Sequence, residues 1–438
     1  MPRAPRLDAT LPMLAQGYAW FPDRRRATGR NTLQTRVMGL RTLGLEGPAA
    51  AEFFYDERNV QRRTAMPEPV LSTLFGHGAV HTLDGEAHRV RKALFLTLLT
   101  REGVTDLVGR TAAAWDAAVP QWADRERVVL FQESAQVLTR GVSGWAGLTL
   151  DDDEVPAFAA DLTAMVDGFA TAGRRHWRAR RARARREAWL AGVVQDVRRG
   201  ATVARPGSAL DVVARHRDLD GQLLHPRVAA VELLNTIRPT VAVAWFMAFS
   251  AHALHRWPEV AASLRAAGPE QLGERGYAWA FAHEVRRFYP FAPFTGGRAA
   301  RDLEWDGERV PAGSMVLLDI WGQDHDPELW EEPFAFRPER FVGREIGPFE
   351  LIPQGGGSPV TGHRCPGEDL TIALLQTLVP RLAALRYEVP EQDLEISLRR
   401  IPALPASRVV LAGVRPAPTG DGVAQRPAAA GVDAQRER

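Results

Sequence analysis

Cys365 is the one cysteine of the 438-residue chain, and it lies in the segment Gly362-His363-Arg364-Cys365-Pro366-Gly367. A single cysteine cannot close an internal disulfide, so its chemistry is that of a thiol or a thiolate. The amides of Gly367 and of a helix beginning at Glu368 are placed to donate to an anionic sulfur, which predicts a lowered thiol pKa. Two uses compete: a metal ligand, or a nucleophile with His363 as its base. The nucleophile also needs a third group to orient that base, and the sequence shows none; a buried structural cysteine is the remaining alternative.

Two upstream segments accompany the cysteine loop: Glu284-Val285-Arg286-Arg287 and Phe336-Arg337-Pro338-Glu339-Arg340-Phe341. Glu and Arg at i, i+3 share a helix face, and a second guanidinium can hold the same carboxylate in a fork. In this order the three segments resemble the cytochrome P450 superfamily over residues 50–412. The resemblance implies a mostly α fold with a small β region, and Arg340 locking the Glu284–Arg287 pair. It also implies haem b between a long central helix and the cysteine loop, with Cys365 as the axial ligand of the iron.

The long central helix is expected from Pro226 to His255, where the chain is nearly apolar. Its uninterrupted apolar part, Thr240–Ala251, is too short to cross a bilayer, which indicates a buried helix. Its middle, Asn235-Thr236-Ile237-Arg238-Pro239-Thr240, carries no acid beside the threonine. The Arg238-Pro239 pair resembles the fatty-acid peroxygenase branch of the superfamily. Because Pro239 cannot donate to the Asn235 carbonyl, we expect a kink at this point.

Arg238 would place a permanent cation in an apolar cavity, and a buried cation requires an anion. One candidate anion is a protein carboxylate such as Glu232; the other is a fatty-acid carboxylate, which suits the guanidinium fork. A carboxylate held there could take a proton from hydrogen peroxide and return it as the O–O bond breaks. Thiolate ligation favours that cleavage. Oxidation is then expected at the α and β carbons.

The same resemblance implies roles for further side chains. His81 would lie above the haem, and a histidine at this place resembles branch members that also release carbon dioxide and leave a terminal alkene. Contacts to the haem propionates are implied for His88, Lys92, His363 and Arg62. Walls of the substrate channel are implied for Phe75, Phe169, Phe291 and Phe294, with plain core packing as the alternative for the last three.

The cysteine loop departs from the common family pattern. Ser358 and Thr361 stand where a phenylalanine and a glycine are usual, and Gln354-Gly355-Gly356-Gly357 begins a longer loop. The longer loop is typical of the peroxygenase branch, so the departure favours this branch over a generic monooxygenase.

Composition adds few constraints. The net charge of +2 and the 45% hydrophobic content are typical of a globular chain. No apolar run near the start resembles a signal peptide or an anchor, so we expect the protein to lie in the cytoplasm of a prokaryote.

Lys92 is the one lysine of the chain. The arginine-rich run Arg174–Arg186 is interpreted as a solvated helix face, with a phosphate-binding patch as the alternative. We expect one catalytic domain over residues 1–413 and a disordered tail over residues 414–438.

Helical spacing of apolar residues predicts helices over residues 88–99, 106–118, 155–171, 178–198, 208–216, 226–256, 258–267, 274–288 and 367–385. Strands are expected on both sides of an Asp-Gly turn within residues 303–310, over residues 315–320, and near residues 399–414.

The sequence thus predicts a haem-thiolate peroxygenase that needs hydrogen peroxide and a fatty acid, with no obligatory redox partner, no nucleic acid and no membrane anchor. Two alternatives stay open: a monooxygenase dependent on oxygen and a redox partner, in which Asn235 and Thr236 organise protons, and a haem-binding sensor without turnover.

Overall fold

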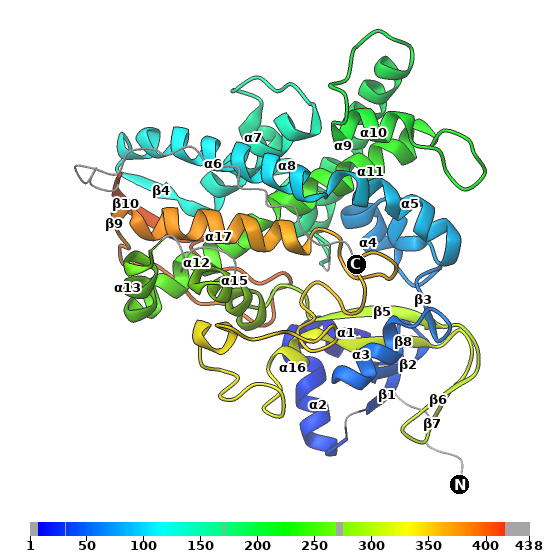
Figure 1. Cartoon of the computed structure of the whole chain (residues 1–438). Coiled ribbons are helices and arrows are strands. Elements are labelled where there is room, and N and C mark those ends of the chain that lie inside the picture. The colour runs from blue at the N-terminus through cyan, green and yellow to red at the C-terminus, as the bar shows by residue number, and fades with distance from the viewer. Residues whose placement is uncertain (1–7, 31, 170, 269–274, 417–438) are drawn as a thin grey trace, which may run out of the picture.

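The computed structural model describes residues 8–30, 32–169, 171–268 and 275–416. A helix-rich part and a sheet-rich part lie one above the other in Figure 1, with the loop before α17 (Glu368–Ala384) between them. This loop carries Cys365. The predicted mostly α fold with a small β region is confirmed.

Two buried helices run through the helix-rich part, α11 (Pro226–Val241) and α12 (Val243–Arg256). The sequence predicted a single helix kinked at Pro239, whereas the interruption lies at Ala242, three residues later. The Ala242 amide still donates to the Arg238 carbonyl at 3.0 Å, and the Trp245 amide donates to the Ala242 carbonyl at 3.1 Å. The missing donor of Pro239 is therefore accommodated within α11, and a tighter turn follows it.

The surrounding helices pack their apolar faces on α11, α12 and α17, and form one large hydrophobic cluster. Most lie where apolar spacing predicted them, with ends that differ by a few residues. They are α5 (Gly85–Leu98), α6 (Arg101–Ala123), α7 (Leu130–Ala146), α8 (Val155–Asp167), α9 (Arg174–Arg198), α10 (Ala209–Arg215), α13 (Pro258–Ala266) and α15 (Tyr277–Phe288). Of these, α7 was not predicted.

The sheet-rich part is built on a five-stranded sheet in the order β1-β2-β8-β5-β3. Only the central pair, β2 and β8, is parallel, with Thr42 opposite Met315. A three-stranded sheet, β4-β10-β9, and the hairpin β6-β7 complete the strands. The strand bounds are β1 (Thr32–Val37), β2 (Leu40–Leu45), β3 (Val60–Gln61), β4 (Arg127–Val129), β5 (Phe294–Ala299), β6 (Leu303–Trp305), β7 (Glu308–Val310), β8 (Met315–Asp319), β9 (Arg386–Glu388) and β10 (Val410–Arg415).

Short helices connect these parts. They are α1 (Thr10–Gln16), η1 (Gly17–Ala19), α2 (Trp20–Thr28), α3 (Pro48–Tyr55), α4 (Glu68–Val70), the π-helix η2 (Leu71–Phe75), η3 (Val80–Thr82), α16 (Ile320–Asp324) and η4 (Pro338–Phe341).

The predicted hairpin around Asp306-Gly307 is present as β6-β7, and the predicted strand over 315–320 is β8. Strand β10 continues to Arg415, so it extends past the expected domain end at residue 413. The rest of the expected tail, residues 417–438, lies outside the described residues. Among the described ranges, no helix combines the length and the apolar character that a membrane span requires.

Most of the arginine-rich run in helix α9 is exposed, as the sequence indicated; the exposed residues are Arg174, Arg178, Arg180, Arg181 and Arg185. Several arginines of this helix bind acids of α8: Arg178 lies 2.9 Å from Asp167, and the half-buried Arg186 lies 2.7 Å from Asp161. Arg183, by contrast, is buried, with 2% of its surface exposed. The helix is therefore held to α8 by charge pairs and sends one guanidinium into the interior.

Candidate active site

Cys365 lies at the end of the long glycine-rich loop, directly before α17. Its amide donates to the Gln354 carbonyl at 3.0 Å, which closes the loop. Lys92 of α5 reaches the same loop, where its Nζ donates to the carbonyls of Gly362 and, at 2.9 Å, Arg364. Burial raises the pKa of the Cys365 thiol, while the Gly367 amide and Lys92 act in the opposite direction. The predicted lowering of this pKa is therefore wrong for the protein alone, because desolvation outweighs the amide donors.

The Glu284–Arg287 pair on α15 is buried and bidentate. Arg287 Nε and Nη2 lie 2.8 and 2.7 Å from the two carboxylate oxygens of Glu284, and neither side chain is exposed. Arg340 of η4 approaches the same carboxylate, with 3.2 Å from Nε to Oε2. The Arg337 amide adds a further donor at 2.8 Å, which the sequence had not indicated. Glu284 is therefore surrounded by donors from two distant segments, and this arrangement fixes the chain that leads to the cysteine loop.

Arg238 lies on α11 and is 5% exposed. Within the described ranges, no carboxylate lies at ion-pair distance from it, and its buried Nε has no hydrogen-bond partner. Burial, followed by the positive charge of Arg183, lowers the pKa of Arg238 to about 9. Glu232, the protein acid proposed as its partner, instead binds Arg91 of α5 at 2.8 Å. The alternative of an Arg238–Glu232 pair is therefore wrong.

Phe75 and His81 stand beside this cation. Their ring centroids are 4.2 Å apart, and the guanidinium carbon of Arg238 lies 6.0 Å from the Phe75 ring centroid. Burial, and then the charge of Arg238, hold the pKa of His81 well below its ordinary value of 6.5. The imidazole is therefore neutral at neutral pH.

The backbone that carries Phe75 and His81 is held by side chains from α9 and α11. Arg183 donates to the Leu74 carbonyl at 2.6 Å and to the Phe75 carbonyl at 2.8 Å. Asn235 Nδ2 also donates to the Phe75 carbonyl, at 2.9 Å, and Glu232 accepts the Val80 amide at 2.8 Å. Sequence reasoning missed Arg183 and Glu232 in this role, because only the fold brings residues more than a hundred positions apart together.

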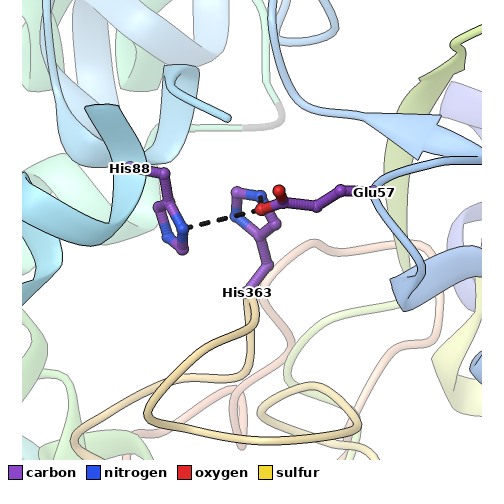
Figure 2. A group of neighbouring side chains, drawn as sticks. All are labelled: Glu57, His88 and His363. Atoms are coloured by element: carbon purple, nitrogen blue, oxygen red, sulfur yellow. Dashed lines mark ion pairs between the residues drawn. The ribbon is translucent and has the colours of Figure 1, made fainter. Parts of the chain in front are cut away.

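The residues assigned to the haem propionates gather where α5 meets the cysteine loop. The rings of His88 and His363 stack with centroids 4.0 Å apart. Figure 2 shows Glu57 beside both rings, and its Oε1 lies 3.1 Å from His363 Nε2 and 3.7 Å from His88 Nδ1. No local pattern in the sequence marks Glu57 as part of this site. Arg62 is buried against the Phe54 ring at 4.2 Å, and its Nη1 has no partner within the described part of the chain.

These residues fit a haem. The loop offers a soft sulfur donor, and the buried Arg62 retains an unsatisfied N–H that suits a carboxylate. Lys92 points toward loop carbonyls, while His88 and His363 stack together. A bound haem would therefore be held by Cys365 at the iron, with Arg62, His88 and His363 available at its acidic edge.

The three other phenylalanines predicted to line the substrate channel, Phe169, Phe291 and Phe294, lie in two different hydrophobic clusters. Phe291 packs against Phe246 and Trp245 of α12, with ring centroids 5.1 and 6.2 Å apart. Phe169 packs against the same large cluster. Phe294 begins β5 and packs against the separate cluster formed by α1, α2 and the sheet. The structure thus brings Phe169 and Phe291 to the helix cluster and leaves Phe294 in the packing of the sheet-rich part.

Comparison with known proteins identifies the class. A family model described as Cytochrome P450 matches residues 259–404. Cytochrome P450 71A8 of Mentha piperita is 35% identical over 147 residues, which are 32% of this chain and 28% of that protein. Carnosic acid synthase of Rosmarinus officinalis is 33% identical over 141 residues, or 28% of this chain and 27% of that protein. The chain therefore spans less than a third of the length of these curated relatives.

Solved structures match over nearly the whole chain. A variant of cytochrome P450SP alpha (CYP152B1) is 42% identical with a TM-score of 0.89, covering 94% of this chain and 99% of that one. Ligand-free cytochrome P450 OleT is 36% identical with a TM-score of 0.90, covering 95% and 99%. An OleT variant in complex with arachidonic acid is 36% identical with a TM-score of 0.90, and the match covers 94% of this chain and 98% of that one.

Fold and site together define a haem-thiolate oxidoreductase. The chain belongs to the cytochrome P450 family, and its similarity to CYP152B1 and OleT confirms the branch that the sequence indicated. The expected haem cofactor is confirmed with the family.

Proposed function

We propose that the protein is a haem-thiolate peroxygenase that uses hydrogen peroxide to oxidise fatty acids at their α and β carbons, with some decarboxylation to terminal alkenes. The observation that carries this proposal is the buried guanidinium of Arg238, for which the described chain supplies no carboxylate. A buried charge without a partner is costly, so a bound anion stabilises this arrangement. Similarity to OleT, one of whose solved structures holds arachidonic acid, supports a fatty acid as that anion.

Each part of the site has a role in this mechanism. Haem ligated by the Cys365 thiolate supplies the chemistry that cleaves the peroxide O–O bond and oxidises the substrate. Arg62, Lys92, His88 and His363 hold the acidic edge of the haem and the loop beside it. Arg238 binds the substrate carboxylate in a bidentate fork, which fixes the position of the first carbons of the chain.

The bound carboxylate also moves the proton. While it is held by Arg238, it takes a proton from one oxygen of hydrogen peroxide and returns it to the oxygen that leaves as water. This role replaces an acidic side chain on the central helix. Pro239 shapes the turn that carries Arg238, and Phe75 with His81 covers the carboxylate side of the cavity. Phe169 and Phe291 are proposed as walls for the alkyl chain, and Phe294 as a packing residue.

The contacts of Asn235 and Thr236 weigh against the monooxygenase alternative. Thr236 Oγ1 donates back to the Glu232 carbonyl at 3.0 Å, and Asn235 Nδ2 donates to the Phe75 carbonyl at 2.9 Å. The Asn235 amide nitrogen and the Thr236 hydroxyl proton are thus engaged with the protein, while Asn235 Oδ1 has no hydrogen-bond partner among the described residues. A haem sensor without turnover would not need a free guanidinium at the substrate position. We therefore propose that the protein needs no obligatory redox partner. We also propose a single catalytic domain that includes strand β10 to its end at Arg415.

The test is incubation of the haem-loaded protein with a series of fatty acids and hydrogen peroxide, with products analysed by mass spectrometry. A parallel reaction contains oxygen, a reductase and reduced nicotinamide cofactor, with catalase to remove peroxide. We expect hydroxy acids, and alkene, only with peroxide. Turnover confined to the reductase reaction would establish the monooxygenase instead, and no product in either reaction would favour the sensor.

A further inference from the structure

A glutamine side chain lies against the sulfur of Cys365. Gln354 Nε2 is 3.9 Å from Sγ, within the range of a hydrogen bond to sulfur, and the Gln354 carbonyl accepts the Cys365 amide at 3.0 Å. Gln354 is therefore tied to the cysteine through both its main chain and its side chain. It opens the long glycine-rich loop, eleven residues before the cysteine.

The orientation of the Gln354 amide follows from its neighbours. Arg286 Nε lies 2.9 Å from Gln354 Oε1. A guanidinium has donors and no acceptor, so only the amide oxygen can face it. The NH2 group must then face the other way, toward Thr371 Oγ1 at 3.1 Å and toward the sulfur. The sulfur therefore receives N–H and not a lone pair.

Arg286 is itself held in one position. It is buried, with 1% exposed, and its Nη2 donates to Glu368 at the start of α17. Its Nη1 lies 3.0 Å from His283 Nδ1, one turn earlier on α15. Glu368 also accepts from Arg364 at 2.6 Å. Because the guanidinium is fixed by two partners, it can hold the amide of Gln354 without freedom to turn.

If Cys365 ligates the haem iron, a hydrogen bond from Gln354 to its sulfur affects the iron–sulfur bond. Hydrogen bonds to a metal-bound cysteine sulfur withdraw charge from the metal–sulfur bond and change the reduction potential. The common family pattern has a phenylalanine seven residues before the cysteine, a side chain with no N–H, whereas Ser358 stands there in this chain. The amide of Gln354 supplies a polar contact that such a ring cannot make.

We propose that Gln354 donates a side-chain hydrogen bond to the Cys365 thiolate, and that Arg286 positions this donor, so that the pair sets the charge the sulfur gives to the haem iron. The inference rests on the proposed ligation of haem by Cys365. Gln354 and Arg286 act through the sulfur and are positioning residues. The competing interpretation is that Gln354 only closes the loop, in which case its replacement changes stability and leaves the iron–sulfur bond unchanged.

The test replaces Gln354 in the haem-loaded full chain. Gln354→Met keeps the length of the side chain and removes the donor. Gln354→Glu keeps its shape and a partner for Arg286, but turns an oxygen toward the sulfur. The matched control is Gln323→Met, the same change at a buried glutamine that donates to the Phe349 and Glu350 carbonyls instead.

Three properties are measured in each variant: haem content, the midpoint reduction potential, and the iron–sulfur stretching frequency by resonance Raman spectroscopy. Both Gln354 variants are expected to bind haem, to have a more negative potential than the parent, and to show a higher stretching frequency. Gln323→Met is expected to match the parent in the last two properties.

Gln354 variants that match the parent in potential and stretching frequency would overturn the proposal. So would failure of both Gln354 variants to bind haem while Gln323→Met binds it, because Gln354 would then serve loop folding alone. If the parent itself lacked the red-shifted carbon monoxide band of thiolate-ligated haem, the failure would belong to the proposed ligation. The two failures are therefore distinguishable.

Discussion

Arg91 of α5 and Glu232 of α11 form a buried ion pair, with 2.8 Å between Nη1 and Oε1. Their exposed fractions are 4% and 0%. Arg91 also donates to the Gly78 carbonyl at 3.0 Å, and Glu232 accepts the Val80 amide. The pair therefore joins three segments: the helix of Lys92, the helix of Arg238 and the loop of His81. It also occupies the acid nearest in sequence to Arg238 on α11, so that Glu232 is not a partner for that cation.

Glu232→Gln should strongly destabilise the fold. It leaves the Arg91 guanidinium buried with less compensation, and breaking a buried pair from one side costs about 3–5 kcal/mol. The double variant Arg91→Met/Glu232→Leu removes both charges and should recover a large part of this loss. Thermal unfolding of the parent and the variants measures both effects. If the single change were as stable as the parent, the pair would have no structural role.

Cys365→Ala should abolish thiolate ligation. Reduced parent protein with carbon monoxide should show the strongly red-shifted Soret band of thiolate-ligated haem, and the variant should lack it. Its far-ultraviolet circular dichroism provides the control for folding. A band that persists in the variant would exclude Cys365 as the ligand.

Arg238→Ala should bind haem normally and lose fatty-acid turnover. The loss of a desolvated carboxylate anchor costs about 2–5 kcal/mol of binding. Titration of each protein with a fatty acid, followed by the haem absorbance, gives the affinities. Arg238→Lys keeps a charge without the fork and should be intermediate. A fatty alcohol of the same length is the control ligand and should not bind the alanine variant more weakly. Equal fatty-acid affinity in parent and variant would show that the carboxylate is held elsewhere.

His81→Gln should lower the alkene fraction and leave peroxide use intact. About 1.4 kcal/mol changes a product ratio tenfold, so a mixture of hydroxy acids and alkene is expected from the parent. Because the pKa of His81 lies well below 6.5, the ring is already neutral at pH 6.5 and stays neutral above it. The product ratio should thus be constant between about pH 6.5 and 8. Gas chromatography of the products checks both points, and a ratio that followed a neutral-pH titration would show a charged ring.

The buried carboxyl pair Glu46 and Asp319 should contribute less to the free energy of unfolding as the pH rises above about 4. Glu46 follows β2 and Asp319 is the last residue of β8, its parallel neighbour. Both carboxyls approach Gly322, where a Cβ would lie 2.2 Å from Asp319 Oδ2 and 2.9 Å from Glu46 Oε2. Burial raises both pKa values, and the charge of Asp319 raises that of Glu46 further. Arg25 lies 2.7 Å from Glu46 and favours its ionised form, but one cation balances only one of the two acids. The pair therefore retains a proton.

The sign of this effect follows from the raised pKa values. The folded state binds the proton more tightly than the unfolded chain, whose carboxyls have pKa values near 3.8 and 4.5. The stabilising contribution of this pair is thus complete below about pH 4 and is lost as the pH rises toward the folded pKa values of about 9 for Glu46 and about 8 for Asp319, by about 1.4 kcal/mol for each unit of pKa shift. Glu46→Gln should flatten this dependence in urea unfolding measured from pH 5 to 9. Parallel curves for the parent and the variant would contradict the shared proton.

Local pattern was enough to predict the cysteine loop, the Glu284–Arg287 pair and the apolar helix with Arg238, because each depends on residues close in sequence. Helix α7 was missed although its apolar residues have helical spacing, since Gly141 and Gly144 weaken the signal. The β1-β2 hairpin was missed because its turn places Met38 at a φ of 53°, a conformation that a turn residue of this type rarely adopts.

The charge environment could not be predicted from the sequence. The pKa of Cys365 rises and that of His81 falls because of burial, which only the fold determines. The contact of Glu57 with His363 joins residues 306 positions apart, and no local pattern marks it. Contacts between residues far apart in sequence thus determine which buried charged side chains have a partner within the protein and which do not.

The buried position of Lys92 has a practical consequence for labelling experiments. Lys92 is the one lysine of the chain, it is 3% exposed, and its ammonium is engaged by carbonyls of the cysteine loop. Every other basic side chain apart from histidine is a guanidinium, so the folded surface offers amine-directed reagents no lysine. Acylation of Lys92, detected by peptide mapping, will therefore report the opening of the cysteine loop. The rate of acylation will measure how often the loop opens.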